Sequence, residues 1–402
     1  MTGRLHVAMI HAHKVIEIVA AGGALAAAAY YLVVLRSVRA YFTERDASSF
    51  SCTGKQSASL PAVSILKPLK GVDPEIYESL RSHCLQDYSD YEIIFGVSEQ
   101  DDPAVESVLR LRKEFPSAKI QLVHCSQRLG ANTKVSNLAQ MLPTARHDLL
   151  IVNDSDIRVR SDYLRRLIGP LLDPKIGMVT CLYRGIAGPT FGSKLESLGI
   201  STDFSAGVLV AQHIEGGIKF GLGSTLCVRR RDLEAIGGFE SLVDYLADDY
   251  ELGKRISDLG LKVWLSEVVV ETFLPAYTLR SFLHHQLRWS RAVRGSRQAG
   301  YVGLLFTFGL PWAVLALIAS RGSAWAWVLL ACVASLRLLV AWTVGRRVLG
   351  DDQLRSHLPL LPLRDFVAVL IWFGSFFGNR ISWRGDYFRL KDRKLVRVDH
   401  GE

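Results

Sequence analysis

Paired cysteines and low-complexity tracts are both missing from this sequence of 402 residues. Its six cysteines are scattered and form no C-x-x-C pair, at positions Cys52, Cys84, Cys125, Cys181, Cys227 and Cys332. This spacing favours neither a zinc site nor a disulfide framework. We therefore expect the chain to work in a reducing compartment.

Charge and hydropathy exclude a disordered chain, because 22% of the residues are charged and 49% are apolar. The net charge is +9 with 48 Lys and Arg residues, yet the mean hydropathy is positive. A high content of basic residues and a positive mean hydropathy are compatible when charged and apolar residues occupy different stretches of the chain, as in membrane proteins. The basic residues lie beside apolar segments and not in aromatic-interleaved stripes, so we expect a lipid bilayer, and no nucleic acid, as partner.

The first apolar stretch predicts a membrane anchor. Val15 to Leu35 contains one charge, Glu17, and its length at the helical rise is about 31 Å, or about one hydrocarbon thickness. Aromatic and basic residues close the stretch as they close an interfacial anchor, so a spanning helix is favoured over a cleaved signal peptide. These residues are Tyr30, Tyr31, Arg36 and Arg39.

Two further apolar stretches lie near the C-terminus. Tyr301–Ser320 and Ala324–Val344 predict a helical hairpin, and the basic residues that follow it place the preceding middle segment in the cytoplasm. Arg337 inside the hairpin is either a functional intramembrane charge or a residue that faces the neighbouring helix. Phe366–Phe377 is short for a span and precedes a basic tail, so we interpret it as re-entrant or interfacial.

The middle of the chain predicts an α/β domain with a mostly parallel sheet. Short β-rich apolar runs alternate with helical patterns that follow Pro74, Pro103, Thr133 and Ser161. The expected strands are Val63–Leu66, Tyr91–Val97, Lys119–His124, Asp148–Val152 and Gly177–Leu182. We therefore expect a membrane anchor (1–44), a cytosolic α/β domain (45–280), an interfacial amphipathic helix (281–300), a membrane region (301–379) and a basic cytosolic tail (380–402).

Polar residues follow the expected strands, at the sheet edge where ligands bind in such folds. Lys67, Asp102 and Lys134 are candidate substrate-binding residues there, although Asp102 before Pro103 could simply cap a helix. Asp154 and Asp156 come directly after a buried apolar run. In a short turn both can present oxygens to one hard divalent cation that keeps coordination sites open for a diphosphate.

Two later segments carry further candidates. Asp248 and Asp249 open a helical pattern, where acidic residues either stabilise the helix end or supply a general base that takes a proton from a hydroxyl. The segment 281–291 has the pattern of a basic amphipathic helix at a membrane surface. We expect Arg288 within it to reach a phosphate and Trp289 to pack beneath the site.

Taken in order, these motifs resemble the D, D, D, (Q/R)-x-x-R-W signature of inverting membrane glycosyltransferases. Within that group the chain is similar to the ceramide glucosyltransferase family, glycosyltransferase family 21, and most to its bacterial members, including hopanoid-associated ones. The resemblance implies a GT-A-like α/β fold with a mixed, mostly parallel sheet and transmembrane helices at both ends. The segments that carry it are 101–103, 154–156, 248–250 and 285–289, with 67–73, 130–137, 180–185 and 381–384.

The resemblance implies roles for the carboxylates. Asp102 would contact the uridine end of a sugar nucleotide. Asp154 and Asp156 would hold Mg²⁺ or Mn²⁺ on its diphosphate, and Asp249 would be the catalytic base.

The same resemblance assigns the basic helix to the leaving group. Arg288 and Trp289 would support the leaving diphosphate and the acceptor, with Asp248 and His285 as further substrate-binding residues. His285 departs from the usual Gln or Arg, and a protonated or suitably tautomeric imidazole could still donate a hydrogen bond.

The expected function is inverting transfer of a sugar from a UDP-sugar, foremost UDP-glucose, to the hydroxyl of a membrane lipid such as ceramide. Alternatives are transfer from UDP-N-acetylglucosamine to a hopanoid polyol, a polyprenyl-phosphate sugar transferase, and a non-catalytic lipid-binding scaffold. A processive polysaccharide synthase normally needs more spanning helices. We expect a multi-pass protein of the bacterial inner membrane whose catalytic domain faces the cytoplasm.

Overall fold

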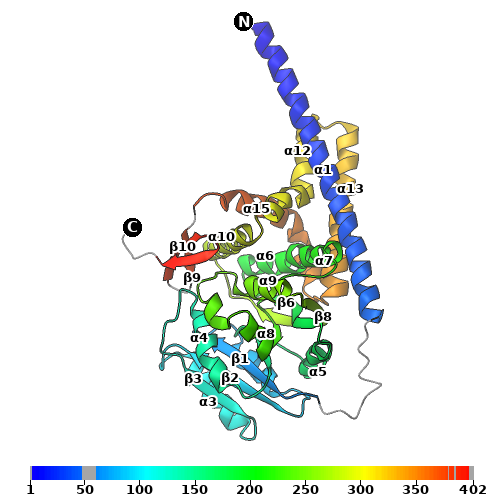
Figure 1. Ribbon diagram of the computed structural model, residues 1–402. Helices are drawn as coiled ribbons and strands as arrows, with labels where there is room; N and C mark the ends of the chain where they lie inside the picture. The colour runs from blue at the N-terminus through cyan, green and yellow to red at the C-terminus, as the bar shows by residue number, and fades with distance from the viewer. Residues whose placement is uncertain (1, 48–59, 379, 384–385, 398–402) are drawn as a thin grey trace.

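The structure, a computed structural model, describes residues 2–47, 60–378, 380–383 and 386–397. Cys52 and Arg384, which belong to the sequence patterns above, lie outside these residues. An α/β domain packs beside one end of the long helix α1 (Thr2–Ala47), and C-terminal helices line the middle of α1 (Figure 1). The five described cysteines are unpaired thiols.

The centre of the α/β domain is an eight-stranded sheet in the order β3-β2-β1-β4-β7-β6-β8-β5. Strands β7 and β5 run antiparallel to their neighbours, and all other pairs are parallel. The predicted mixed, mostly parallel sheet is therefore confirmed. Its strands are β1 (Val63–Leu69), β2 (Tyr91–Val97), β3 (Ile120–His124), β4 (Leu149–Val152), β5 (Ile157–Arg158), β6 (Ile176–Ile186), β7 (Leu226–Arg229) and β8 (Lys262–Phe273).

Helices cover both faces of this sheet, and four of them follow the residues that the sequence indicated. These four are α2 (Ile76–Cys84), α3 (Ala104–Glu114), α4 (Thr133–Met141) and α5 (Tyr163–Ile168). The others are α6 (Phe191–Gly199), the π-helix η3 (Ile200–Phe204), α7 (Ser205–Ile214), α8 (Arg230–Ala235), α9 (Asp248–Asp258) and α10 (Leu279–Ser296). Short 3₁₀ turns complete the domain at η1 (Leu142–Thr144), η2 (Gly169–Leu172) and η4 (Phe239–Leu242).

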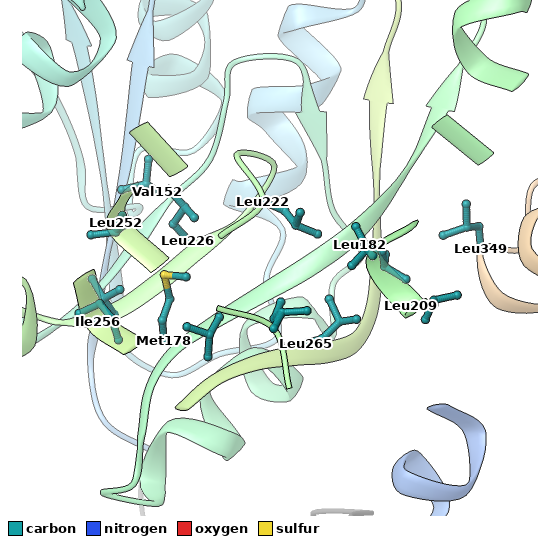
Figure 2. Close-up of a cluster of buried hydrophobic side chains, with 14 of the residues drawn as sticks. Val152, Met178, Leu182, Leu209, Leu222, Leu226, Leu252, Ile256, Leu265 and Leu349 are labelled. Carbon is teal, nitrogen blue, oxygen red and sulfur yellow. The ribbon is translucent and has the colours of Figure 1, made fainter. Parts of the chain in front are cut away.

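The two faces of the sheet bury separate hydrophobic cores. All seven residues of β1 are buried, as expected for a central parallel strand that is covered on both sides. Leu66 faces one core and Ile65 faces the other, because successive side chains of a strand point to opposite faces. Figure 2 shows part of the first core, where Val152, Met178 and Leu226 meet side chains of α9. Residues of α1 join this same core, so the anchor and the domain are packed together.

Three helices are long and apolar enough to cross a membrane among the described residues, and a bent pair could supply a fourth span. They lie within α1, within α13 with the π-helix η6, and within the run from α14 to α15. The C-terminal elements are α11 (Gln298–Gly303), η5 (Leu304–Thr307), α12 (Gly309–Ala319), α13 (Ala324–Ala341), η6 (Trp342–Val348), α14 (Leu354–His357), η7 (Leu358–Leu360) and α15 (Leu361–Gly374).

The first arm of the predicted hairpin is not one straight helix. It bends by 52° between Thr307 and Gly309. At the bend, the hydroxyl of Tyr31 on α1 forms two hydrogen bonds with the backbone. It donates to the carbonyl of Thr307 at 3.0 Å and accepts from the amide of Gly309 at 3.1 Å. A Cβ at Gly309 would lie 2.9 Å from that hydroxyl, so only glycine allows this approach. The carbonyl of Thr307 and the amide of Gly309 therefore have a hydrogen-bond partner at the bend without water.

The third apolar stretch is longer than the sequence suggested, because the helical run extends from Leu354 to Gly374 over 21 residues. The charged side chains of Arg364 and Asp365 interrupt its apolar pattern, but both are buried against other elements. Helix α15 packs on α10, α6 and α12 and lies across the direction of α1 and α13 (Figure 1). The assignment of this stretch as re-entrant or interfacial stays a prediction.

The predicted basic tail forms a small antiparallel sheet where it is described. Its strands are β9 (Arg380–Trp383), β10 (Asp386–Lys391) and β11 (Lys394–Arg397). Arg291 of α10 donates to the carbonyls of Phe377 and Arg380, and the amide of Leu395 donates to the carbonyl of Asp244 at 2.7 Å. These bonds hold the segment against the α/β domain.

Candidate active site

The turn after β4 carries the first two candidate carboxylates. Lys67 is fully buried in β1 and donates from Nζ to the backbone carbonyl of Asp154 at 2.9 Å. Asp156 accepts from the hydroxyl of Thr272 at 2.5 Å, and Ser155 donates to the side chain of Asp73. Hydrogen bonds with Lys67, Thr272 and Asp73 therefore fix the turn. Burial lowers the pKa of Lys67 to about 7, against the opposing charges of Asp156 and Asp154.

Lys134, at the start of α4, joins this turn to the start of α9. Its ammonium group lies 2.7 Å from Oδ1 of Asp154 and 3.4 Å from Oδ2 of Asp248. Asn132 caps α4 by accepting from the amide of Val135 at 3.2 Å, and its Nδ2 donates to Asp248 at 3.2 Å. The packed helix starts bring together side chains that lie more than a hundred residues apart.

Asp249 is held beside this pair by a glycine-rich loop. Its Oδ2 accepts from the amide of Gly223 at 2.8 Å, and its Oδ1 accepts from the amide of Tyr250 at 2.8 Å. Burial and the neighbouring charge of Asp248 raise the pKa of Asp249 to about 6, against the opposing effect of Lys134. A carboxylate with such a pKa is ionised near neutral pH and can still accept a proton, as a general base must.

The loop before β7 was missed by the sequence analysis. A Cβ added to Gly223 would lie 3.3 Å from Oδ2 of Asp249 and 3.4 Å from Oδ2 of Asp154. Gly223 therefore lines the space between the base and the first carboxylate of the turn. The loop is anchored by Ser224, whose carbonyl accepts from Asn153 at 2.7 Å. Gly221 and Gly223, two glycines close together before a strand, were the signal that could have identified it.

The carboxylates of the turn suit a divalent cation by their chemistry. Asp154 and Asp156 offer hard oxygen ligands, and burial together with the charges of Asp154 and Asp73 raises the pKa of Asp156 to about 6. This mutual repulsion is what a bound cation would relieve. Within the described parts of the chain, no group of three His, Cys, Asp or Glu side chains could hold a metal alone. Asp154 and Asp156 together with the oxygens of a diphosphate would complete the ligands of the cation, and such oxygen ligands fit Mg²⁺ or Mn²⁺.

Asp102 lies in the loop between β2 and α3 and is mostly buried. Both of its oxygens accept from the amide of Gly71 at 3.0 Å, and Oδ1 also accepts from the amide of Ala104 at 2.9 Å. It therefore does fix the start of α3, as the simpler interpretation held, and it also shapes the loop after β1. Its contact with uridine stays a prediction.

The amphipathic helix α10 places three candidates together. Nη2 of Arg288 lies 3.3 Å from Nδ1 of His285, and the rings of His285 and Trp289 are 5.5 Å apart. Trp289 also meets Phe204, which meets Tyr183 of β6, with ring centroids 6.0 and 5.2 Å apart. These rings connect α10 to the core of the sheet. Burial, and then the Arg288 charge, lower the pKa of His285 to about 3, so its ring is neutral.

Tyr183 lies between the carboxylate group and α10. Burial, followed by the charges of Asp249 and Glu196, raises the pKa of Tyr183, and the charges of Asp154 and Asp156 act in the same direction. The charges of Asp154, Asp156 and Asp249 thus act on one buried side chain, and Lys134 contacts both Asp154 and Asp248. Lys134 joins Asp154 to Asp248, whereas Lys67 lies in the interior beneath the turn, and the roles assigned to these residues stay predictions.

The chain is similar in sequence to known proteins. The sequence pattern of Glycosyl transferase family 21 matches residues 19–396. The chain is 28% identical over 236 residues to "Ceramide glucosyltransferase 3" of Caenorhabditis elegans, covering 58% of this chain and 51% of that protein. It is 24% identical over 267 residues to "Beta-monoglucosyldiacylglycerol synthase" of Synechocystis, and the match covers 64% of this chain and 53% of that protein. The chain spans about half the length of these curated relatives.

Among solved structures, the mannosyltransferase PcManGT of Pyrobaculum calidifontis, in complex with GDP-Man and Mn²⁺, is similar with 19% identity and a TM-score of 0.49. It covers 87% of this chain and 99% of that one. The family match extends over the α/β sheet and over apolar helices, near both ends of the chain, that are long enough to cross a membrane. The chain belongs to glycosyl transferase family 21.

Proposed function

We propose that this protein transfers glucose from UDP-glucose to the hydroxyl of a membrane lipid such as ceramide, with inversion at the anomeric carbon. The observation that carries the proposal is the cluster of Asp154, Lys134 and Asp249 after the sheet strands, in a chain whose N-terminal and C-terminal helices can enter a membrane. The names of two relatives describe the glucosylation of ceramide and of diacylglycerol. Both names support glucose as the sugar and a lipid as the acceptor.

In this reaction Asp249 takes the proton from the lipid hydroxyl as that oxygen attacks the sugar. The hydrogen bonds from the amides of Gly223 and Tyr250 fix the orientation of the carboxylate. Asp154 and Asp156 would hold the divalent cation, which supplies positive charge for the leaving diphosphate. Lys134 adds a fixed positive charge on the same side. One direct displacement by the hydroxyl inverts the anomeric centre.

The membrane elements explain how a lipid reaches this site. Exposure of a lipid tail to water costs about 0.8 kcal/mol for each CH₂ group, so the reaction must occur where the headgroup already lies. Helix α15 exposes Phe366, Leu370 and Phe373, and α10 exposes Leu283 beside its arginines. These apolar and basic side chains suit the boundary between headgroups and acyl chains. We propose that the catalytic domain faces the cytoplasm, at the bacterial inner membrane.

The test is mass spectrometry of lipids from cells that express the protein, with Asp249→Asn as the inactive variant. A lipid that gains a hexose only with the active protein supports the proposal. Asp258→Asn at the exposed end of α9 is the matched control and should leave product formation intact. Gain of an N-acetylhexosamine on a hopanoid, sugar on a polyprenyl phosphate, or a polysaccharide would identify an alternative. Full activity of Asp249→Asn would overturn the assigned base.

A further inference from the structure

A buried carboxylate beneath α10 takes no part in the mechanism above. Glu196 of α6 is 2% exposed, and its Oε2 accepts from Nε2 of Gln286 at 2.5 Å. Its Oε1 faces Nε2 of His285 at 3.6 Å. Gln286 in turn accepts from Nη2 of Arg364 at 3.3 Å. One oxygen of Glu196 is therefore occupied by an amide, and the other is directed at the imidazole ring.

The opposite nitrogen of this ring meets two hydrogen-bond donors. The hydroxyl of Tyr277 and Nη2 of Arg288 each lie 3.3 Å from Nδ1 of His285. A guanidinium group donates and never accepts, so Nδ1 must present its lone pair to Arg288. In a neutral ring the proton then sits on Nε2, where Glu196 faces it. The positions of the neighbours thus select one tautomer of His285.

We propose that Glu196 is a positioning residue, which keeps the proton of His285 on Nε2 so that Nδ1 can accept from Arg288 and hold its guanidinium toward the departing diphosphate. This inference rests on the proposed function for the identity of the leaving group. It gives His285 the role of an acceptor for Arg288, whereas the sequence suggested a donor to the substrate. The low pKa of His285, caused first by burial, agrees with a neutral ring.

Replacement of Glu196 by glutamine is the informative change, because the shape remains and the pattern of donors is altered. An amide has one oxygen, so it cannot accept from both Gln286 and His285. When its oxygen faces Gln286, its NH₂ group faces Nε2 of His285 and favours the other tautomer. That tautomer carries a proton on Nδ1, where the N–H of Arg288 also points. We expect Arg288 to lose its fixed direction.

The experiment measures the affinity of the purified full chain for UDP in the presence of Mn²⁺, by calorimetry, together with kcat and KM for the donor. Glu196→Gln should weaken UDP binding about tenfold, in the range expected for a lost hydrogen bond to a charged group. Arg288→Met should weaken it at least as much. The double variant should bind no more weakly than Arg288→Met alone, because both changes remove the same interaction.

Two control variants separate positioning from general damage. The conservative variant His285→Gln should bind UDP more tightly than His285→Ala, since one amide can accept from Arg288 and donate to Glu196. Asp351→Asn alters another buried carboxylate, bonded at 2.7 Å to Ser201, and should leave UDP affinity unchanged even if the protein loses stability. A ¹⁵N spectrum of His285, assigned through His285→Gln, should show protonated Nε2 in the native chain and a shift toward protonated Nδ1 in Glu196→Gln.

Independent, multiplicative losses in the double variant would overturn the proposal, and so would an unchanged tautomer or unchanged UDP affinity in Glu196→Gln. These readouts need no lipid product. If native protein yields no glycolipid but still binds UDP with the expected variant pattern, then the acceptor assignment fails while the positioning role stands. If UDP does not bind the native chain at all, the proposed donor fails.

Discussion

The ammonium group of Lys134 lies 2.7 Å from Oδ1 of Asp154, a candidate metal ligand, and 3.4 Å from Oδ2 of Asp248, the neighbour of the candidate base. Burial alone would lower the pKa of Lys134, but the charges of Asp154 and Asp248 raise it, so the group is a permanent cation. One side chain thus links the part of the site that would hold the diphosphate to the part that would accept the proton.

Activity should therefore depend on pH through Asp249. Its carboxylate must be ionised to act as a base, so kcat/KM should rise with pH through an apparent pKa near 6 that belongs to the coupled acidic pair. Lys134→Met removes the cation that lowers this pKa, so the rise of kcat/KM should shift to higher pH by about one unit. The rates are measured from pH 4.5 to 8. The control is Lys254→Met, whose lysine lies on the exposed side of α9. An unchanged apparent pKa in Lys134→Met would contradict the electrostatic interaction between Lys134 and Asp249.

The same shift predicts a change in stability. The folded-state pKa of Asp249 lies above its ordinary value of 3.8, so the folded protein holds this proton more tightly than the unfolded chain does. Its contribution to stability is greatest below about pH 4, declines as the pH rises toward about 6, and is constant above that. Asp249→Asn should flatten this part of the profile, when the apparent Tm is measured in detergent at several pH values. A steeper decline in the variant would refute the sign.

Removal of divalent cations should abolish transfer. Asp154 and Asp156 supply too few ligands to hold a cation tightly without the diphosphate, so chelator treatment should be quickly reversible with Mg²⁺ or Mn²⁺. Asp156→Asn should raise the metal concentration needed for half-maximal rate, and Asp258→Asn should leave it unchanged. The measurement is a titration of the initial rate with metal at fixed donor. Full activity in excess chelator would exclude a metal-dependent reaction.

Gly223 tests the space between the base and the metal turn. A Cβ there would lie 3.3 Å from Asp249 and 3.4 Å from Asp154, inside the space that the reacting groups must share. Gly223→Ala should lower kcat/KM about a hundredfold through misplacement of those groups. Gly207→Ala on α7 is the control, because nothing lies within 4 Å of its added Cβ and the exchange favours a helix. Equal effects of the two exchanges would argue against a shared reaction space.

The buried pair of Arg337 and Asp365 should matter for stability. Arg337 of α13 is 3% exposed and donates to Asp365 of α15 through Nε at 3.0 Å and Nη2 at 2.7 Å. It also donates to the carbonyl of Thr202 at 3.2 Å, so it faces its neighbours and not the lipid. Arg337→Met leaves Asp365 unpaired and should cost about 3 to 5 kcal/mol.

The matched control for this pair is the double variant Arg337→Met with Asp365→Leu, which removes both buried charges. It should recover part of the lost stability, because Asp365 is no longer left unpaired and Asp203, the other carboxylate that Arg337 contacts, still pairs with Arg364 at 3.4 Å. Apparent Tm values in one detergent at one heating rate provide the comparison. A double variant less stable than the single one would show that the pair itself stabilises the helices.

The sequence determined the order and kind of most elements near the site. Apolar runs with polar ends predicted β1, β2, β3, β4 and β6, because a buried strand that ends in a ligand-binding loop leaves both signals in its own residues. It did not reveal β5, a strand of two residues, nor β7 and β8, which are bounded by charged or glycine-rich segments. It also left the last described residues as a basic tail, since alternation in β9 to β11 is concealed by their many charges.

For the site, residue type and position nominated the carboxylates after β4, because polar side chains directly after a buried strand lie at the ligand-binding edge of such a sheet. At the start of α9 the same residue type also stabilises the helix end, so the sequence alone left both roles open for Asp248 and Asp249. Their partners depended on tertiary structure. Lys134 meets Asp248 only because α4 and α9 pack start to start, and Gly223 meets Asp249 only because the loop before β7 folds over α9. The same holds for the bend at Tyr31 and for Glu196 beneath His285. Chain order encodes which groups exist, whereas packing between distant segments decides which of them touch.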